Sequence, residues 1–198
     1  MAPTVKPGIG YIDAIITKVA LCTLPTWRAA GFTPNGLTTL GLVCTVATLA
    51  ATYRALLGGT AGADTAAFVA AVFLALRAYF DYADGLMARK FGMTTDIGGW
   101  YDHVVDWFFV AGFTAIIAKY DWRLLFLLVP LYATVTASVG CMEDQSEEVH
   151  GSLSGAVWLC RALRLPRPVL MVLDNGFLYV VMAAIIVVGT SVRGGNVS

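Results

Sequence analysis

Residues 81–106, DYADGLMARKFGMTTDIGGWYDHVVD, place five aspartates between two strongly apolar segments, residues 66–80 and 107–118. The five are Asp81, Asp84, Asp96, Asp102 and Asp106. Charged residues make up only 13% of the chain and hydrophobic residues 58%, whereas a soluble domain carries about 25% charged residues. This composition predicts an all-α, polytopic membrane protein. Charged groups in such a protein are costly and are usually retained for function.

Five segments are long and apolar enough to cross a bilayer, which takes about 20 residues per helix. They lie at 36–57, 65–90, 97–118, 124–142 and 175–192. Residues 8–30 mix apolar and charged side chains at helix-like intervals, which predicts an amphipathic helix on the membrane surface. Residues 151–168 are short and basic, and the pattern fits either a second interfacial helix or a half-span. We expect residues 1–198 to form a single domain.

Basic residues indicate the orientation of the bundle. With five spans and an internal N-terminus, eight basic residues fall on the cytoplasmic side and four on the other. Cytoplasmic loops carry the excess of lysine and arginine, so the aspartates are predicted to face the cytoplasm, in whichever membrane the protein resides. Acidic and basic residues number 13 each, and this balance leaves no electrostatic footprint for nucleic acid.

The spacing of the aspartates predicts that they converge. Residues three, four or seven apart share one face of a helix, so Asp81 and Asp84 lie on one stripe of the second span. Asp102 and Asp106 lie on one stripe of the third span, and a short turn near residues 91–95 joins the two on the same side. If these stripes face each other, four carboxylates share a half-buried volume where bare anions repel and are costly to desolvate.

Divalent cations would resolve this repulsion. Ligands that are all oxygen point to magnesium, manganese or calcium rather than zinc, and a pair of such ions is the usual clamp for phosphate chemistry. Gly85 and Gly98 lack side chains and would leave room for a ligand against the backbone. Arg89 is placed to hold a phosphate through a bidentate contact.

The same stretch resembles, position for position, the signature of the CDP-alcohol phosphotransferase (phosphatidyltransferase) family. The matching residues are Asp81, Asp84, Gly85, Ala88, Arg89, Gly98, Asp102 and Asp106. TPNGLTTLGL, at residues 33–42, is also similar to family members. The resemblance implies transfer of a substituted phosphate from a CDP-linked donor to an alcohol, with release of CMP. It further implies six transmembrane helices, a homodimer and two divalent metal ions, Mg²⁺ or Mn²⁺.

The resemblance also implies a role for each signature residue. The implied metal ligands are Asp81, Asp84, Asp102 and Asp106. Asp106 is additionally implied as the base that deprotonates the attacking hydroxyl. The residues implied to surround the cytidine and diphosphate of the donor are Asp84, Gly85, Ala88, Arg89 and Gly98.

The substrates follow from the branch of the family that the chain resembles. Its compact length is similar to the branch that uses CDP-diacylglycerol and a small polar alcohol, with inositol favoured. The pair Asp102–His103 is reminiscent of the longer enzymes that join CDP-choline or CDP-ethanolamine to diacylglycerol. The basic cluster of Arg161, Arg164 and Arg167 is a candidate for binding a phosphate-bearing acceptor, or it is an inside-positive anchor.

Two further residues, Arg77 and His103, each have two interpretations, and Asp96 has a purely structural one. Arg77 lies one turn before Asp81 and either pairs with it or binds a phosphate or headgroup. His103 is either a packing residue or a contact to the acceptor. Asp96 precedes the third span and is predicted to be its N-cap.

Two non-enzymatic classes also place aspartates in a membrane. A cation channel or transporter would line its path with carboxylates, and a silent scaffold would keep them as structure. Neither accounts for Gly85, Ala88, Arg89 and Gly98 at these spacings. Binding of a cytidine nucleotide distinguishes an enzyme of this family from both.

Overall fold

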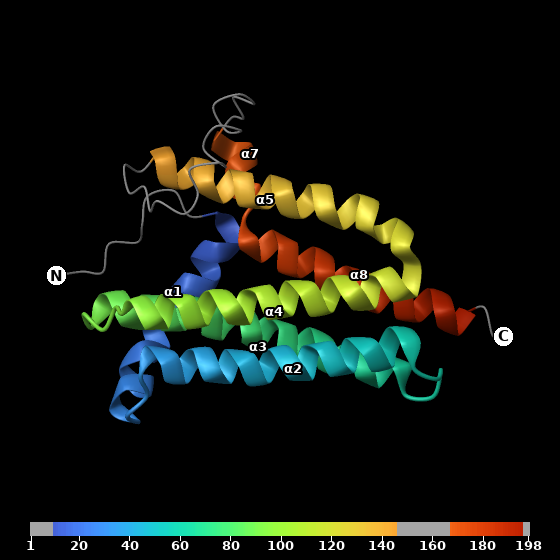
Figure 1. Ribbon diagram of the computed structural model, residues 1–198, viewed down its shortest axis with the longest axis horizontal. Coiled ribbons are helices and arrows are strands. Elements are labelled where there is room, and N and C mark those ends of the chain that lie inside the picture. Colours follow the sequence, from blue (N-terminus) through green and yellow to red (C-terminus); the bar gives the residue numbers. More distant parts are fainter. Residues whose placement is uncertain (1–9, 146–166, 196–198) are drawn as a thin grey trace.

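The computed structural model describes residues 10–145 and 167–195, and the regular structure in these ranges is entirely helical. The helices are α1 (Tyr11–Ala29), α2 (Pro34–Leu57), α3 (Ala63–Lys90), α4 (Asp96–Asp121), the 3-10 helix η1 (Trp122–Leu124), α5 (Leu125–Gln145), α7 (Arg167–Val172) and α8 (Asn175–Gly195). The long helices α2, α3, α4, α5 and α8 run roughly along the long axis of the molecule, whereas α1 crosses near one end (Figure 1). The predicted all-α bundle is confirmed.

Each predicted span coincides with one helix, in chain order α2, α3, α4, α5 and α8. Within the described ranges, three helices are long and apolar enough to cross a membrane, namely α2, α3 and α8. The spans at α4 and α5 stay predictions, as does the total number of spans. Most of the segment 151–168, including Arg161 and Arg164, lies outside the described residues, and Arg167 is the first residue of α7.

The chain reverses between α3 and α4 at the expected turn. Gly92 adopts a left-handed conformation there, with φ of 63°, which glycine reaches without the steric cost of a Cβ atom. The predicted N-cap at Asp96 is wrong, because the cap is Thr95. Thr95 has extended backbone angles and its hydroxyl accepts from the N–H of Gly98 at 3.0 Å. Asp96 is already the first helical residue, where its charge favours the positive end of the helix.

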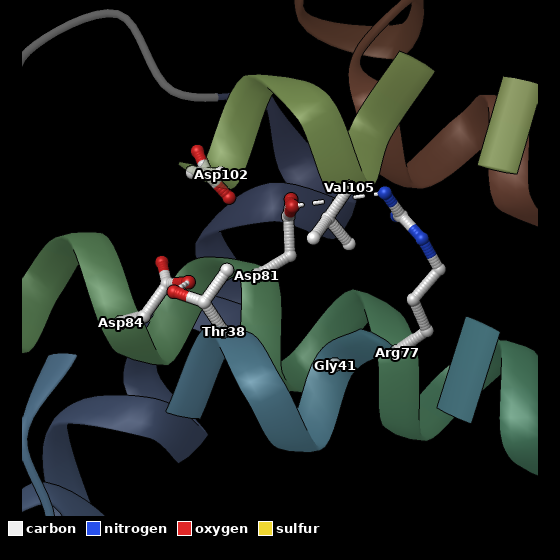
Figure 2. Close-up of a pocket in the computed structure, with 7 residues that line it drawn as sticks. All are labelled: Thr38, Gly41, Arg77, Asp81, Asp84, Asp102 and Val105. Carbon is white, nitrogen blue, oxygen red and sulfur yellow. Dashed lines mark hydrogen bonds and ion pairs between the residues drawn. The ribbon is translucent and has the colours of Figure 1, made fainter. Parts of the chain in front are cut away.

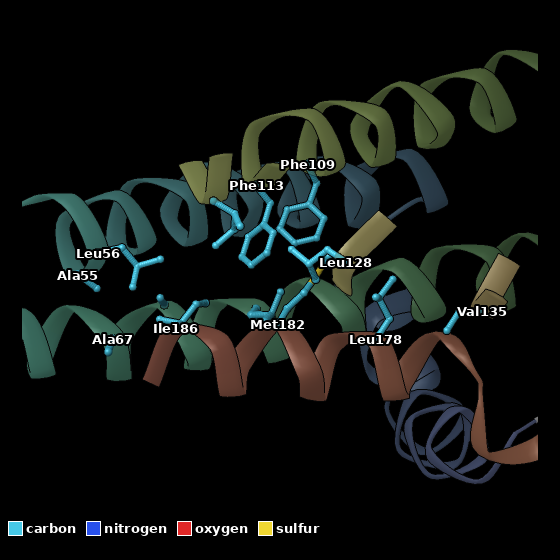
Figure 3. Packing of buried hydrophobic residues seen from close by; sticks show 13 residues of the cluster. Ala55, Leu56, Ala67, Phe109, Phe113, Leu128, Val135, Leu178, Met182 and Ile186 are labelled. Carbon is cyan, nitrogen blue, oxygen red and sulfur yellow. The ribbon is translucent and has the colours of Figure 1, made fainter. Parts of the chain in front are cut away.

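Two apolar clusters hold the bundle together. The larger one joins α2, α3, α4, α5 and α8 around the buried rings of Phe109 and Phe113 (Figure 3). The smaller one packs Ala20 and Leu24 of α1 against α2 and α3. Burial of apolar area contributes roughly 25 cal/mol per Å² in water, but between helices in lipid close packing has to supply the attraction.

Helix α1 corresponds to the predicted interfacial helix at residues 8–30. One face is buried against α3 and α8 and includes Asp13 and Thr17. The opposite face exposes the apolar side chains of Tyr11, Ile15 and Val19. An exposed apolar face is what a helix lying against lipid requires, and its placement at the membrane surface stays a prediction.

The N-termini of α1 and α8 are joined through two buried carboxylates. Asp174 is fully buried, and its Oδ2 accepts from the N–H groups of Ile12 at 2.8 Å and Asp13 at 3.0 Å. Its Oδ1 accepts from the N–H of Phe177 at 2.7 Å. In return, Asp13 Oδ1 accepts from the N–H of Gly176 at 2.8 Å. Each acid therefore satisfies backbone groups at the start of the other helix, which lack partners within that helix.

We expect Asp174→Ala to destabilise the protein by about 2–4 kcal/mol, because it removes a cap from both helices and leaves three backbone N–H groups unpaired, one of them buried and two part-buried. The apparent unfolding temperature in detergent should fall by on the order of 5–10 °C. The control is Asp64→Ala, which removes an exposed aspartate from the first turn of α3. Equal unfolding temperatures for the two variants would contradict the account of the α1–α8 junction.

Candidate functional site

The carboxylates come from the adjoining ends of α3 and α4. Asp81 of α3 and Asp102 and Asp106 of α4 each offer an oxygen, and these oxygens lie within 4.8 Å of one another. The helical spacing explains the grouping, since Asp102 and Asp106 are one turn apart on one face of α4. The structure therefore brings three of the four predicted carboxylates together.

Asp84 lies beside this group, on the side that faces α2. It is 5% exposed, and its Oδ2 accepts a hydrogen bond from the hydroxyl of Thr38 at 2.5 Å. Figure 2 shows both side chains at the edge of one small pocket. Thr38 belongs to the TPNGLTTLGL segment, so α2 supplies the partner that orients this acid.

The pocket is partly open, and about 180 Å³ of space, including solvent at its mouth, lies among its lining atoms. Its lining residues are Thr38, Gly41, Arg77, Asp81, Asp84, Asp102 and Val105. The pocket therefore lies directly against the carboxylate group.

Arg77 is the cation at this pocket. It is 3% exposed, and its Nη2 donates to Oδ1 of Asp106. The same nitrogen lies 3.9 Å from Asp81, the partner that sequence proximity indicates. Its Nη1 donates to the hydroxyl of Tyr179 in α8. The close ion pair is therefore with the acid on the neighbouring helix, and Asp81 is the more distant one.

The two signature glycines make room for protein atoms. A Cβ atom on Gly85 would lie 3.2 Å from Nη1 of Arg89, and one on Gly98 would lie 2.8 Å from Oδ1 of Asn35. Gly85 thus allows the guanidinium of Arg89 to lie against the α3 backbone. Gly98 allows the start of α2 to approach the first turn of α4.

The remaining predicted residues lie around the pocket. Ala88 is half-buried, and Arg89 is exposed near the end of α3. His103 is exposed on α4, next to Asp102 in sequence. Three neighbours of the site were not singled out from the sequence: Asn35, Thr38 and Tyr179. Asn35 and Thr38 stand in the TPNGLTTLGL segment, which resembles members of a known family, but no local sequence pattern marks Tyr179.

The charges and donor atoms of the site fit divalent cations. Four carboxylates and one guanidinium leave three formal negative charges in a partly buried volume. Such a group is costly unless cations compensate it. The ligand atoms are carboxylate oxygens, which hard ions such as Mg²⁺ and Mn²⁺ prefer. The residues present therefore fit a metal-assisted phosphate chemistry.

Comparison with known families gives one match. The family model described as CDP-alcohol phosphatidyltransferase matches residues 32–192, which is most of the chain. The matched region contains every signature residue from Asp81 to Asp106 and begins after α1. No match to a curated protein was found.

Proposed function

Because the chain belongs to the CDP-alcohol phosphatidyltransferase family, we propose that it transfers a substituted phosphate from CDP-diacylglycerol to a small polar alcohol. Inositol is the favoured acceptor, and CMP is the second product. The observation that carries the proposal is the convergence of Asp81, Asp102 and Asp106 within 4.8 Å, inside the matched region. This carboxylate group stands beside a buried arginine and a small pocket.

The carboxylates would hold two divalent cations, Mg²⁺ or Mn²⁺. Asp81, Asp102 and Asp106 would be the central ligands, with Asp84 beside them and oriented by Thr38. When bound, the ions would neutralise the acids and polarise the diphosphate of the donor.

Asp106 is proposed as the general base. The acceptor oxygen forms a bond to the phosphorus that carries diacylglycerol, and the bond from that phosphorus to the bridging oxygen breaks. CMP leaves with the bridging oxygen and its electron pair, and the proton of the acceptor hydroxyl passes to a carboxylate oxygen of Asp106. An alcohol is a poor nucleophile, so a positioned base is needed. The side chain of Asp106 is 44% exposed, which leaves it accessible to an acceptor.

A second candidate function uses CDP-choline or CDP-ethanolamine with diacylglycerol. His103 favours this second function for two reasons. The pair Asp102–His103 resembles those enzymes, and His103 is exposed on α4. If this second function holds, His103 would contact the acceptor. If the first function holds, a basic residue such as Arg77, Arg161 or Arg164 would contact the acceptor or a phosphate.

The experiment is a matrix of CDP-linked donors and alcohols with purified protein and Mg²⁺. CMP release and the lipid product are measured together, and they should form in equal amounts. Turnover with CDP-diacylglycerol and inositol supports the first function, and turnover with CDP-choline and diacylglycerol supports the second. Absence of CMP from every pair would contradict both.

Arg89 is proposed to bind the diphosphate of the donor. Arg89→Lys keeps the charge but loses the planar fork, so we expect the dissociation constant for the donor to rise by about tenfold, with loss of a bidentate contact. Lys90→Arg is the control, since Lys90 is the exposed neighbour outside the signature. Unchanged donor affinity in Arg89→Lys, measured by equilibrium titration, would remove Arg89 from the donor site.

The site is proposed to face the cytoplasm, and the protein is proposed to act as a homodimer. The excess of basic residues on that side supports the orientation, and the family resemblance supports the dimer. Labelling of single cysteines in intact cells would test the first proposal, and the mass of the protein in detergent would test the second.

A further inference from the structure

The last helix places one polar side chain at the edge of the carboxylate group. The hydroxyl of Tyr179 in α8 accepts a hydrogen bond from Nη1 of Arg77. The tyrosine ring lies 5.4 Å from the guanidinium carbon and 6.4 Å from the ring of Phe109. Tyr179 is therefore held by packing on one side and joined to the arginine on the other.

Hydrogen bonds and ring packing hold the guanidinium of Arg77, although its buried Nε has no hydrogen-bond partner among the described residues. The guanidinium carbon of Arg77 lies 4.3 Å from the centroid of the Phe109 ring. One arm of the guanidinium goes to Tyr179 and the other to Oδ1 of Asp106. Arginine and carboxylate otherwise favour a two-armed contact in which both carboxylate oxygens are engaged. The tyrosine thus engages Nη1, so a contact of both terminal nitrogens with Asp106 does not form.

We propose that Tyr179 is a positioning residue, which keeps Arg77 in one-armed contact with Asp106. This leaves the second oxygen of Asp106 available to a metal ion or to the proton of the acceptor. Without the hydroxyl, Nη1 loses its partner in a buried setting, and rotation of the guanidinium onto both oxygens of Asp106 restores one. The consequence for turnover rests on the proposed function, whereas the consequence for cation binding does not.

The variant Tyr179→Phe keeps the ring and removes only the hydroxyl. We expect kcat to fall about tenfold, the size of one lost hydrogen bond to a charged group, while KM for the donor changes less than about twofold. The matched control is Tyr120→Phe. Tyr120 also joins α4 to α8, through a 3.0 Å hydrogen bond from its hydroxyl to the carbonyl of Gly189, away from the carboxylates. The variant Tyr120→Phe should therefore leave kcat unchanged.

A double-mutant cycle separates positioning from general stability. Lysine at position 77 has no fork with which to contact Tyr179 and Asp106 together. In the Arg77→Lys background, Tyr179→Phe should therefore change kcat by less than about twofold. If the two losses multiply instead, the tyrosine does not act through the arginine and the inference is overturned.

Titration with Mn²⁺ gives a readout that does not require turnover. Tyr179→Phe should bind the ion about tenfold more weakly than the wild type, and Tyr120→Phe should bind it equally well. Weakened binding in a protein that releases no CMP would overturn the proposed function and support the positioning role. Normal kcat and normal Mn²⁺ affinity in Tyr179→Phe, beside an active wild type, would overturn the positioning role alone.

Discussion

Replacing Asp106 by asparagine should lower turnover by about 10²–10⁴-fold, the usual contribution of a general base. The amide nearly preserves the shape of the side chain and still offers one oxygen, but it cannot accept a proton at neutral pH. Affinity for the CDP-linked donor should largely survive. The measurement is donor affinity by equilibrium titration beside steady-state turnover, with both proteins in the same detergent.

Asp84→Asn is the comparison that makes this result specific. Asp84 is buried and receives the hydroxyl of Thr38, so its loss should weaken donor and metal binding together. Two results would contradict the assignment of the base to Asp106: normal turnover in Asp106→Asn, or a loss of donor affinity as large as that of Asp84→Asn.

Removal of divalent cations should abolish turnover completely. Three carboxylates within 4.8 Å and a fourth beside them cannot bind an anionic diphosphate while uncompensated, because like charges repel strongly in a partly buried site. Excess EDTA should stop CMP release, and Mg²⁺ or Mn²⁺ added beyond the chelator should restore it.

The unfolding temperature of the protein with and without EDTA accompanies this measurement. If EDTA stops turnover while the unfolding temperature is unchanged, the divalent cations are required for the reaction and not for the folded state. Full turnover in excess EDTA would contradict a metal-dependent mechanism.

The fold of the bundle could be predicted because membrane helices carry their own signals. Length and uninterrupted apolarity located α2 and α8, and the turn near residues 91–95 followed from the break between two apolar segments. These are local properties of the backbone in lipid, which must satisfy its hydrogen bonds within each helix. The error at Asp96 was also local, since Thr95 and Asp96 are both good caps and only the backbone angles choose between them.

The side-chain contacts between helices that are far apart in sequence could not be predicted from local patterns. Asp13 and Asp174 bond across 161 residues of sequence, between helices that have no sequence pattern in common. The same limitation applies to Tyr179, which is 102 residues from Arg77. Such pairs depend on how whole helices pack, and no local spacing encodes that.

The candidate site could be predicted from the sequence only in part. The spacing of Asp81, Asp102 and Asp106 predicted their convergence, because helical periodicity and a short turn fix their relative positions. The partner of Arg77 was less predictable, since Asp81 is near in sequence and Asp106 is near in space.

Equilibrium binding of labelled CMP to the purified protein, with and without Mg²⁺, tests the central claim most directly. A phosphotransferase that takes its group from a CDP-alcohol must bind the leaving nucleotide, whereas a cation channel or a silent scaffold has no reason to do so. We predict saturable CMP binding that requires the cation and is weakened in Asp84→Asn. Absence of CMP binding in the presence of Mg²⁺, in protein that remains folded, would contradict the assignment of this site to CDP-alcohol chemistry.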